Sequence, residues 1–478
     1  MASGSMTPPL GLIVRQQWTS LLRERRLQIL GLLVLALCAL TLFDAGRDAA
    51  RLERARLHDT QVEQQVWQTQ GEANPHGAAH FGRYAYKPHA PLAVIDPGLQ
   101  RHLGSTVKLE GHLQNTSRFK ATDGGAALNR FGGFSPAFAL QVLVPLLIVF
   151  ATFGAFAGER ARQMMWQEIG LGATPWQLML GRATAYGAAV LLLLGTVAVL
   201  ALLATLPAFS PAHLAALGLM LLGYGLYWLA FLCVTLAISA WAANSRSALF
   251  GALGFWMVAA VLVPMVAPAL AEARHPTPSA TVFEAGVVQE VMKGPDGHSP
   301  RDERFAAFKA ATLAQYGVKE VDDLPINYNG LLFEHGEKLT SAIYNRHFDR
   351  LYDDYAAQVR LTLAASAVSP LMALRPLSAL LAQTDMAAHR HFLKQAEAYR
   401  YQTVQALNRD IKLNRKPGHT DYASDVSAIT AAIRFTPRPR PFDALLPDAW
   451  VPFALLLAWV AGGAVLMRLA ARRVEGSA

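Results

Sequence analysis

The sequence predicts an α-helical polytopic membrane protein with six transmembrane helices and two long, mainly helical or mixed insertions. Hydrophobic residues make up 53% of the 478 residues and charged residues only 16%, a balance that is unusual for a soluble protein. Crossing a hydrocarbon core of about 30 Å takes about 20 helical residues. Six apolar runs, most of them long enough for this, occupy residues 29–43, 136–157, 183–206, 212–240, 248–270 and 450–469.

The apolar runs carry almost no charge. None contains Asp, Glu or Lys, and their one Arg, Arg468, lies at the end of the last run. Charges inside a membrane usually mark ion or proton pathways. Their absence argues against an ion-driven pump or a secondary transporter, and it favours a protein that uses energy supplied from elsewhere. Cys38 and Cys233 lie inside runs, where we expect helix packing rather than a disulfide.

The segment before the first run has a pattern of its own. Residues 1–5 resemble a cloning scar and are excluded from the fold. Residues 6–28 are expected to form a cytoplasmic amphipathic helix, and the alternative is a simple extension of the first transmembrane helix, 29–43. No small-residue cleavage site follows the basic stretch, so the first run is predicted to be a signal anchor. The apolar positions at helical spacing are Val14, Trp18, Leu21 and Leu22.

Arginines indicate the orientation of the chain. They outnumber acidic residues in the short segments on one side of the membrane, while the opposite turn at 207–211 has no charge. The positive-inside rule then places both termini in the cytoplasm and the two insertions in the periplasm, across a bacterial inner membrane. Little net charge remains elsewhere, so the basic composition gives little support to nucleic-acid binding. The arginines are Arg15, Arg23, Arg25, Arg26, Arg160, Arg162, Arg182, Arg246, Arg468, Arg472 and Arg473, opposed by Glu24, Glu159, Glu168 and Glu475.

The first insertion, residues 44–135, is expected to begin with a polar helix at 46–70 that continues the first transmembrane helix. A stretch rich in Gly, Pro and His follows at 71–111, too punctuated for one long helix, and glycines mark loops before the next run. Residues 136–270 then hold four transmembrane helices, with a cytoplasmic loop at 158–182.

The second insertion, residues 271–448, is long enough to bury a core of its own. Its aromatic residues at helical spacing are expected to form that core rather than a ligand site. A transmembrane helix at 449–470 and a cytoplasmic tail at 471–478 complete the chain. The helices predicted inside the insertion span 305–316, 337–368 and 386–413.

The chain has no motif for catalysis of its own. A nucleotide-binding P-loop requires Gly-x-x-x-x-Gly-Lys followed by Ser or Thr, and no such run occurs. Neither a Gly-x-Ser-x-Gly elbow nor a His-Glu-x-x-His helix is present. We therefore expect no catalytic residue, no ATPase activity and no cofactor in this chain.

The loop at 158–182 has a charged start, an amphipathic run, a break at 172–175 and a second short helix that leads into the membrane. This resembles the coupling segment of ABC-2-type transporter permeases, in which an acidic start, a turn with Pro and a Gly-Arg pair recur; Glu159, Pro175, Gly181 and Arg182 match. Gln163, Met164 and Met165 replace the usual Gly-Thr-Leu. The alternative is an ordinary cytoplasmic loop. The resemblance implies contact with an ATPase through Trp18, Glu159, Arg160, Arg162, Glu168, Gly172, Pro175 and Arg182.

Motifs in the insertions are similar to those of a subgroup of these permeases that has two large periplasmic insertions. The resemblance implies an exporter built from two permease chains, identical or paralogous, and two copies of a separate ATPase that binds ATP and Mg²⁺. A periplasmic partner is a further expectation. The matching positions are His76, His80, Gly82, Asp96, Pro97, Gly98, Gly104, His112, Asn115, Arg375, Ser378, Asp385, His389 and Arg400.

A second function of another class stays open. The permease of the nitrous-oxide-reductase maturation system is a relative in architecture, and it suggests a device that transmits force to a periplasmic client without moving a solute. The sequence names no substrate for either function.

Histidines gather in the insertions. His76 and His80 have the i, i+4 spacing of a metal pair only if their stretch is helical, which Pro75 and Gly77 make uncertain. Because no third ligand is evident, we expect hydrogen bonding by these histidines and no metal, with a metal pair and pH sensing as alternatives. Asp96, Pro97 and Gly98 are expected to form a turn.

Overall fold

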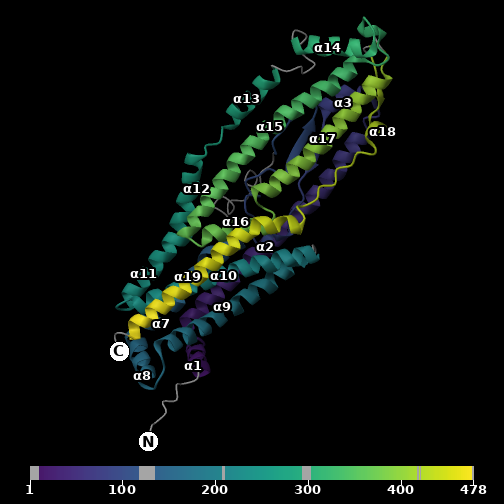
Figure 1. Cartoon of the computed structure of the whole chain (residues 1–478). Helices are drawn as coiled ribbons and strands as arrows, with labels where there is room; N and C mark the ends of the chain where they lie inside the picture. The colour runs from purple at the N-terminus through teal and green to yellow at the C-terminus, as the bar shows by residue number, and fades with distance from the viewer. Residues whose placement is uncertain are drawn as a thin grey trace.

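The computed structural model describes residues 10–117, 135–206, 210–292, 303–416, 419 and 421–475, with the backbone alone at 303–305. Among these residues the fold is almost entirely helical and has no closed sheet (Figure 1). The prediction of a helical membrane protein is confirmed at this level. The scar predicted at 1–5 and the glycine loops predicted before the second run lie outside the described residues. Six helices are long and apolar enough to cross a membrane: Arg25–Gln68, Pro136–Ala157, Pro175–Thr205, Pro211–Trp241, Ser245–Arg274 and Phe442–Glu475.

Helix α10 (Pro211–Trp241) is the centre of the membrane-spanning part. In its most apolar stretch 67% of the residues are buried, against 11% in α2 (Arg25–Gln68) and in α9 (Pro175–Thr205). The two peripheral helices therefore direct most of their apolar side chains outward, as lipid-facing helices do. Around α10 lie the remaining spans, built from α5 (Pro136–Phe138), η3 (Ala139–Leu143), α6 (Val144–Thr152), α7 (Gly154–Ala157), α11 (Ser245–Met257), η5 (Val258–Leu262), α12 (Val263–Arg274) and α19 (Leu446–Glu475).

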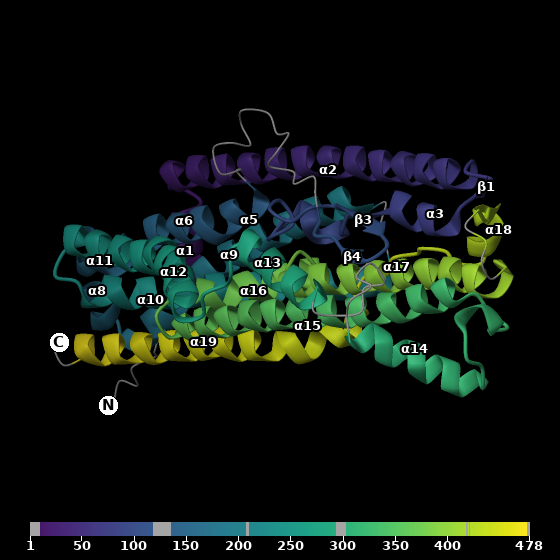
Figure 2. The same cartoon turned by 90° about the horizontal axis from the view of Figure 1, so that it is seen from above.

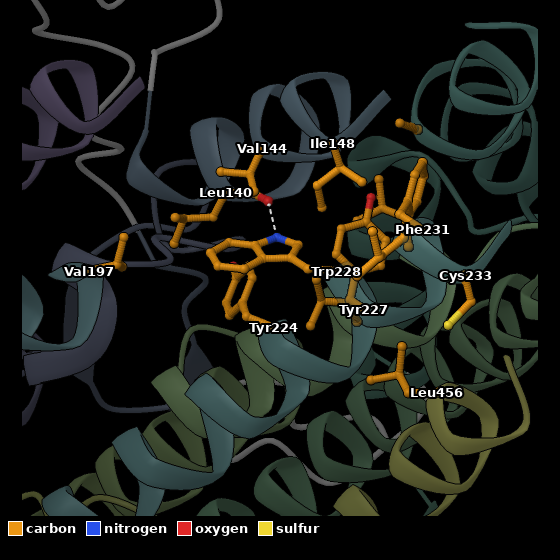
Figure 3. Close-up of a cluster of buried hydrophobic side chains, with 14 of the residues drawn as sticks. Leu140, Val144, Ile148, Val197, Tyr224, Tyr227, Trp228, Phe231, Cys233 and Leu456 are labelled. Carbon is orange, nitrogen blue, oxygen red and sulfur yellow. Dashed lines mark hydrogen bonds between the residues drawn. The ribbon is translucent and has the colours of Figure 1, made fainter. Parts of the chain in front are cut away.

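A proline explains the tight contact between α10 and the second span. Pro145 has no N–H, so the carbonyls of the preceding π-helical turn η3 lose a donor. Two side chains of α10 bond to carbonyls of this turn: Trp228 Nε1 donates to Leu140 O at 2.9 Å (Figure 3), and Tyr227 OH donates to Gln141 O at 2.7 Å. Unsatisfied carbonyls are costly away from water, so these bonds fix the two helices against each other.

Helix α2 links the spans to the far end of the molecule. Its 44 residues give a length of about 66 Å at 1.5 Å per residue, about twice the thickness of a hydrocarbon core. The prediction that a polar helix continues the first span is therefore confirmed, and Figure 2 shows α2 running on to β1. Helix α1 (Leu10–Leu21) is separate and packs against α9, so the alternative of a simple extension is wrong.

The two insertions form one shared domain, which we call the polar domain. Strand β1 (Glu72–Ala73) pairs antiparallel with β5 (Ser424–Asp425), and β2 (Arg83–Tyr86), β3 (Thr106–Glu110) and β4 (Leu113–Gln114) form a second antiparallel sheet. Side chains of that sheet pack on α17 (Met386–Asn414). The core between them contains Ala85, Val107 and Leu109 from the first insertion with Phe392, Ala396 and Tyr399 from the second. The expectation that the second insertion buries a core of its own is confirmed by a separate cluster formed within that insertion by Val287, Ile343, Tyr344 and Phe348.

The helices predicted in the second insertion are present, with shifted ends. They are α14 (Glu303–Tyr316), α15 (Tyr328–Ala364) and α17, and the last of the three was predicted almost residue for residue. The sequence did not predict α16 (Leu371–Ala382), which packs against α10 and α19 and joins the core of the spans. The other helical elements of the domain are α3 (Pro75–Phe81), η1 (Pro91–Val94), α13 (Ala280–Met292), η6 (Val321–Asp323), η7 (Ala365–Ala367), α18 (Val426–Thr430) and η8 (Phe442–Leu445).

Candidate functional site

The predicted coupling residues gather at the end of the molecule opposite the polar domain, where α1, α8 (Glu159–Gly170) and the C-terminal end of α19 lie (Figure 1). Glu159 and Arg160 begin α8 and are exposed. Trp166 and Leu171 are 41% and 76% exposed on the same helix and its end. Charges beside large exposed apolar side chains are typical of a surface that another molecule covers.

The turn between α8 and α9 has a tightly specified backbone. Gly172 has a φ of +94°, and the bonds Gly172 N–H to Ile169 O (2.9 Å) and Ala173 N–H to Glu168 O (3.1 Å) form a Schellman motif. Thr174 and Gln177 then form a capping box, and Pro175 occupies the first turn of α9. The second short helix expected after this turn is instead the start of α9, which runs unbroken to Thr205.

Arg182 connects α8 to the spans. Its guanidinium is buried, lies 3.2 Å from Glu168 Oε2, donates to Ala155 O and stacks over the Phe156 ring at 4.3 Å from the ring centre. It thus joins α9, α8 and α7. Arg162 adds a second link, since its guanidinium donates to Ala242 O at 2.6 Å beyond α10. A displacement of α8 would therefore be passed to three spans.

Helix α1 is held on α9 by close contact. A Cβ added at Gly181 would lie 2.5 Å from Ile13 Cγ2, so only glycine allows this approach. Gln17 also donates to Tyr186 OH at 3.3 Å, and Trp18 is half-buried on α1. The sequence showed Gly181 as part of a motif but did not show Ile13, Phe156 or Ala242, because their roles arise only from tertiary packing.

A second group of predicted residues lies where the polar domain meets the spans. Asp96 follows η1, and its carboxylate accepts from Gly98 N–H at 3.0 Å and from Gln141 Nε2 at 3.4 Å. Gln141 also bonds Tyr224 OH (3.1 Å), which bonds Ser378 Oγ on α16 (3.1 Å). Arg375 Nε donates to Gln141 Oε1 at 3.4 Å. Five polar side chains thus join four separate parts of the chain.

Burial raises the pKa of the Asp96 carboxyl group, although Ser378, the Gly98 N–H and Arg375 favour its charged form. The predicted turn at this position is present. It fits closely against the segment before α17, because Leu99 N–H donates to Thr384 O at 2.9 Å and Thr384 Oγ1 donates to Asp96 O at 3.0 Å. Nearby, Asp385 caps α17 by accepting from Ala388 N–H at 2.9 Å, and His389 is buried one turn later.

A third group lies deep in the polar domain. Arg400 pairs with Glu337 at 2.6 Å and with Glu397 at 2.7 Å, and its Nη1 donates to Glu110 O at 3.0 Å. Burial disfavours the charged form of Glu337, but Arg400 and the His112 N–H outweigh it and lower its pKa. Of the other predicted positions, Asn115 donates to Lys108 O at 3.0 Å, Gly82 adopts a φ of +73° against β3, and Gly104 is buried before β3.

The histidines of the first insertion come together beside this group. The stretch 75–81 is helical, so the spacing of His76 and His80 does place both on one face, with their Nε2 atoms 3.2 Å apart. The sequence missed the third member. His112, from the turn between β3 and β4, brings a ring nitrogen within 4.8 Å of theirs. Among the described residues, these three imidazoles form the one cluster that could hold a metal ion.

A family model described as "Domain of unknown function (DUF3526)" matches residues 281–426, which extend from α13 to the start of α18. The match includes Glu337, Arg375 and Arg400 and excludes the spans. No curated protein matches the chain.

Proposed function

We propose that this protein is the membrane-spanning permease subunit of an ABC exporter in a bacterial inner membrane, driven by a separate ATPase. The chain binds that ATPase through α1, α8 and the start of α9, while ATP and Mg²⁺ are held by the ATPase. Its own residues catalyse nothing and transmit motion.

The observation that carries this proposal is the anchoring of an exposed helix to buried groups. Helix α8 presents Glu159, Arg160 and Trp166 to its surroundings. The same helix is fastened to the spans through the ion pair of half-buried Glu168 with buried Arg182. A helix that is open on one face and fixed on the other can pass the movement of a bound partner into the membrane, as interface helices do in switching proteins.

The arrangement of charge supports a topology with α8 in the cytoplasm and the polar domain in the periplasm. Arg15, Arg160, Arg162 and Arg473 lie on the elements at the α8 end, and the positive-inside rule places such segments in the cytoplasm. A second permease chain, identical or paralogous, would cover part of the apolar surface that α2, α9, α11 and α12 leave exposed, and lipid would cover the rest.

Motion is carried to the polar domain along α2 and through α16. Helix α2 is continuous from the spans to Trp67, whose Nε1 donates to Thr430 Oγ1 at 2.8 Å. Helix α16 rests its buried Leu374 and Leu377 against Gly223 of α10. Both connections act on the polar domain, which would gate release of a substrate or engage a periplasmic partner.

The test is purification of the tagged full-length chain from its native membranes, followed by assay of co-purified ATP hydrolysis. Glu159→Lys combined with Arg160→Glu keeps the net charge but reverses the order of the two charges at the start of α8. This variant should no longer co-purify with the ATPase. Lys319→Glu combined with Glu320→Lys is the matched control, an exposed neighbouring pair in the polar domain. Retention of ATPase activity by the α8 variant, or equal loss in both variants, would overturn the proposal.

Force transmission to a periplasmic client without solute transport is the second candidate. The observation that favours it is the dense polar network of Asp96, Gln141, Tyr224 and Ser378, which fills the junction of spans and polar domain with bonded side chains. Reconstituted complexes that hydrolyse ATP at a rate set by a periplasmic client protein, with no solute accumulation in the vesicles, would favour this second function over export.

A further inference from the structure

We propose that His76, His80 and His112 bind one transition-metal ion of the Zn²⁺ or Cu²⁺ class on the surface of the polar domain. This inference goes beyond the proposed function, since neither export nor force transmission requires a metal here. It rests on the convergence of three imidazoles, on what holds each in place, and on a buried carboxylate beside one of them.

The distances suit a small ion. The ligand atoms of the three histidines all lie within 4.8 Å of one another, and the Nε2 atoms of His76 and His80 are 3.2 Å apart. In a tetrahedral site with metal–nitrogen bonds of about 2.0–2.1 Å, ligand nitrogens are separated by about 3.3 Å. One pair already has this separation, and the third nitrogen needs a shift of no more than about 1.5 Å.

The helix that carries two of the ligands is fixed at both ends. Asn74 caps α3 by accepting from the N–H groups of His76 (2.9 Å) and Gly77 (3.3 Å). The His76 ring stacks on the Phe333 ring with centres 4.0 Å apart and planes 11° from parallel, which sets its orientation. Gly111 N–H donates to Ala79 O at 2.8 Å and so fastens the β3–β4 turn, the source of the third ligand, to the same helix.

His112 is held in a conformation that its residue type rarely adopts. Its φ is +65°, a left-handed value that costs about 1 kcal/mol or more in a residue with a Cβ. The buried carboxylate of Glu337 stabilises this conformation, because its Oε2 accepts a hydrogen bond from His112 N–H at 2.9 Å. A conformation of this kind persists where the surroundings over-determine it, and such places gather at ligand sites.

The same carboxylate can set the tautomer of His112. Glu337 Oε2 lies 3.4 Å from His112 Nδ1. The side chain of Glu337 is fully buried and forms an ion pair with Arg400 at 2.6 Å. A carboxylate beside Nδ1 favours a proton on that nitrogen and leaves the lone pair of Nε2 for a metal. This carboxylate–histidine–metal arrangement is the usual outer shell of histidine sites.

The donor set selects the class of ion. Three neutral imidazole nitrogens suit Zn²⁺ and Cu²⁺ and are poor ligands for Ca²⁺ or Mg²⁺, which prefer oxygen. Three protein ligands leave a fourth position open, as in catalytic or exchanging sites rather than closed structural ones. His80 is exposed, so an ion can enter and leave from solvent. We therefore assign a single exchangeable ion with an open position toward water.

The test uses the full-length chain in detergent, purified through a tag without histidines and stripped with a chelator. Titration with Zn²⁺ against a chelating dye, and with Cu²⁺ followed by electron paramagnetic resonance, should give one site per chain with nitrogen ligation. His80→Ala and His112→Asn should each weaken binding more than about 100-fold, beyond the loss typical of an outer-shell change. Asn tolerates a positive φ, so this variant keeps the backbone of the turn.

His102→Ala is the matched control, because His102 is an exposed histidine of the same insertion. It should bind metal as the unaltered chain does. Glu337→Gln should weaken binding about 10-fold or more with one site retained. Absence of a stoichiometric site, or equal affinity of His80→Ala and His102→Ala, would mean that the histidines only bond one another and would overturn the proposal.

Discussion

The guanidinium of Arg400 and the carboxylate of Glu337 lie 2.6 Å apart in the interior of the polar domain, with side chains only 2% and 0% exposed. Arg400 comes from α17 and Glu337 from α15, and Ser341 and Glu397 complete the bonding around the guanidinium. A buried charge is tolerated only when it is paired and bonded in this way. The pair therefore fixes how the two long helices of the domain meet.

Arg400→Met is expected to destabilise the polar domain by about 3–5 kcal/mol, because Glu337 is left as an uncompensated buried charge. Glu337→Gln combined with Arg400→Met removes the Glu337 charge as well and should recover part of that loss, although the carboxylate of Glu397 also loses Arg400 as its partner. The measurement is thermal unfolding of the two variants and the unaltered chain in one detergent. A double variant less stable than Arg400→Met would show that the pair does not act as a unit.

His389 predicts a dependence of stability on pH. Burial, with a smaller effect of Lys87, lowers the pKa of this imidazole to about 3, whereas an unperturbed imidazole has a pKa of about 6.5. Between these values the unfolded chain binds a proton that the folded chain does not. Stability is therefore complete above about pH 6.5 and falls with pH below it, by up to about 1.4 kcal/mol per unit until about pH 3.

His389→Gln removes the titrating ring and keeps a polar group near Ser117, whose hydroxyl lies 3.3 Å from His389 Nε2. The slope of the melting temperature between pH 6.5 and 4.5 should be shallower in this variant than in the unaltered chain. The exposed His102→Gln should keep the original slope. If the His389 variant also keeps that slope, another group is responsible for the acid sensitivity.

Gly98→Ala should weaken the junction between the spans and the polar domain. Gly98 has a φ of +43°, and an added Cβ would lie 2.4 Å from Thr384 Oγ1 and 2.9 Å from Thr384 O. Both the strain and the clash oppose a side chain, so we expect a loss of about 1–3 kcal/mol. Gly46→Ala is the control, because no atom lies within 4 Å of its added Cβ and alanine favours a helix. The measurement is thermal unfolding, in which Gly98→Ala should lower the melting temperature and Gly46→Ala should not.

The features of the fold that could be predicted from the sequence are those that depend on residue periodicity and on local turn chemistry. The apolar runs, the continuation of α2 beyond the membrane and the break near Gly172 and Pro175 all follow from residue types at short spacing. Helix α16 was missed because a 12-residue apolar helix is too short for a span, and its packing on α10 is not visible in its sequence. His112 as a third neighbour of His76 and His80 was missed because helix α3 and the β3–β4 turn come together only in the folded chain.

Gly181→Ala should displace α1 from α9 while leaving the spans folded. The added Cβ would lie 2.5 Å from Ile13 Cγ2 and 3.0 Å from Ile13 Cβ, and a β-branched side chain has little freedom to move aside. Helix α1 carries Arg15, and Arg23 lies in the turn that follows it, so a loosened helix makes the peptide bonds after these two arginines easier for trypsin to cleave. We expect cleavage at these arginines to be several-fold faster than in the unaltered chain, measured by mass spectrometry of the released peptides. Gly187→Ala places its Cβ at an ordinary 3.8 Å from Leu232 Cδ2 and should cleave at the original rate. Equal rates for the two variants would mean that α1 does not depend on this contact, and the proposed transmission of motion from an ATPase through α1 would then need another route into α9.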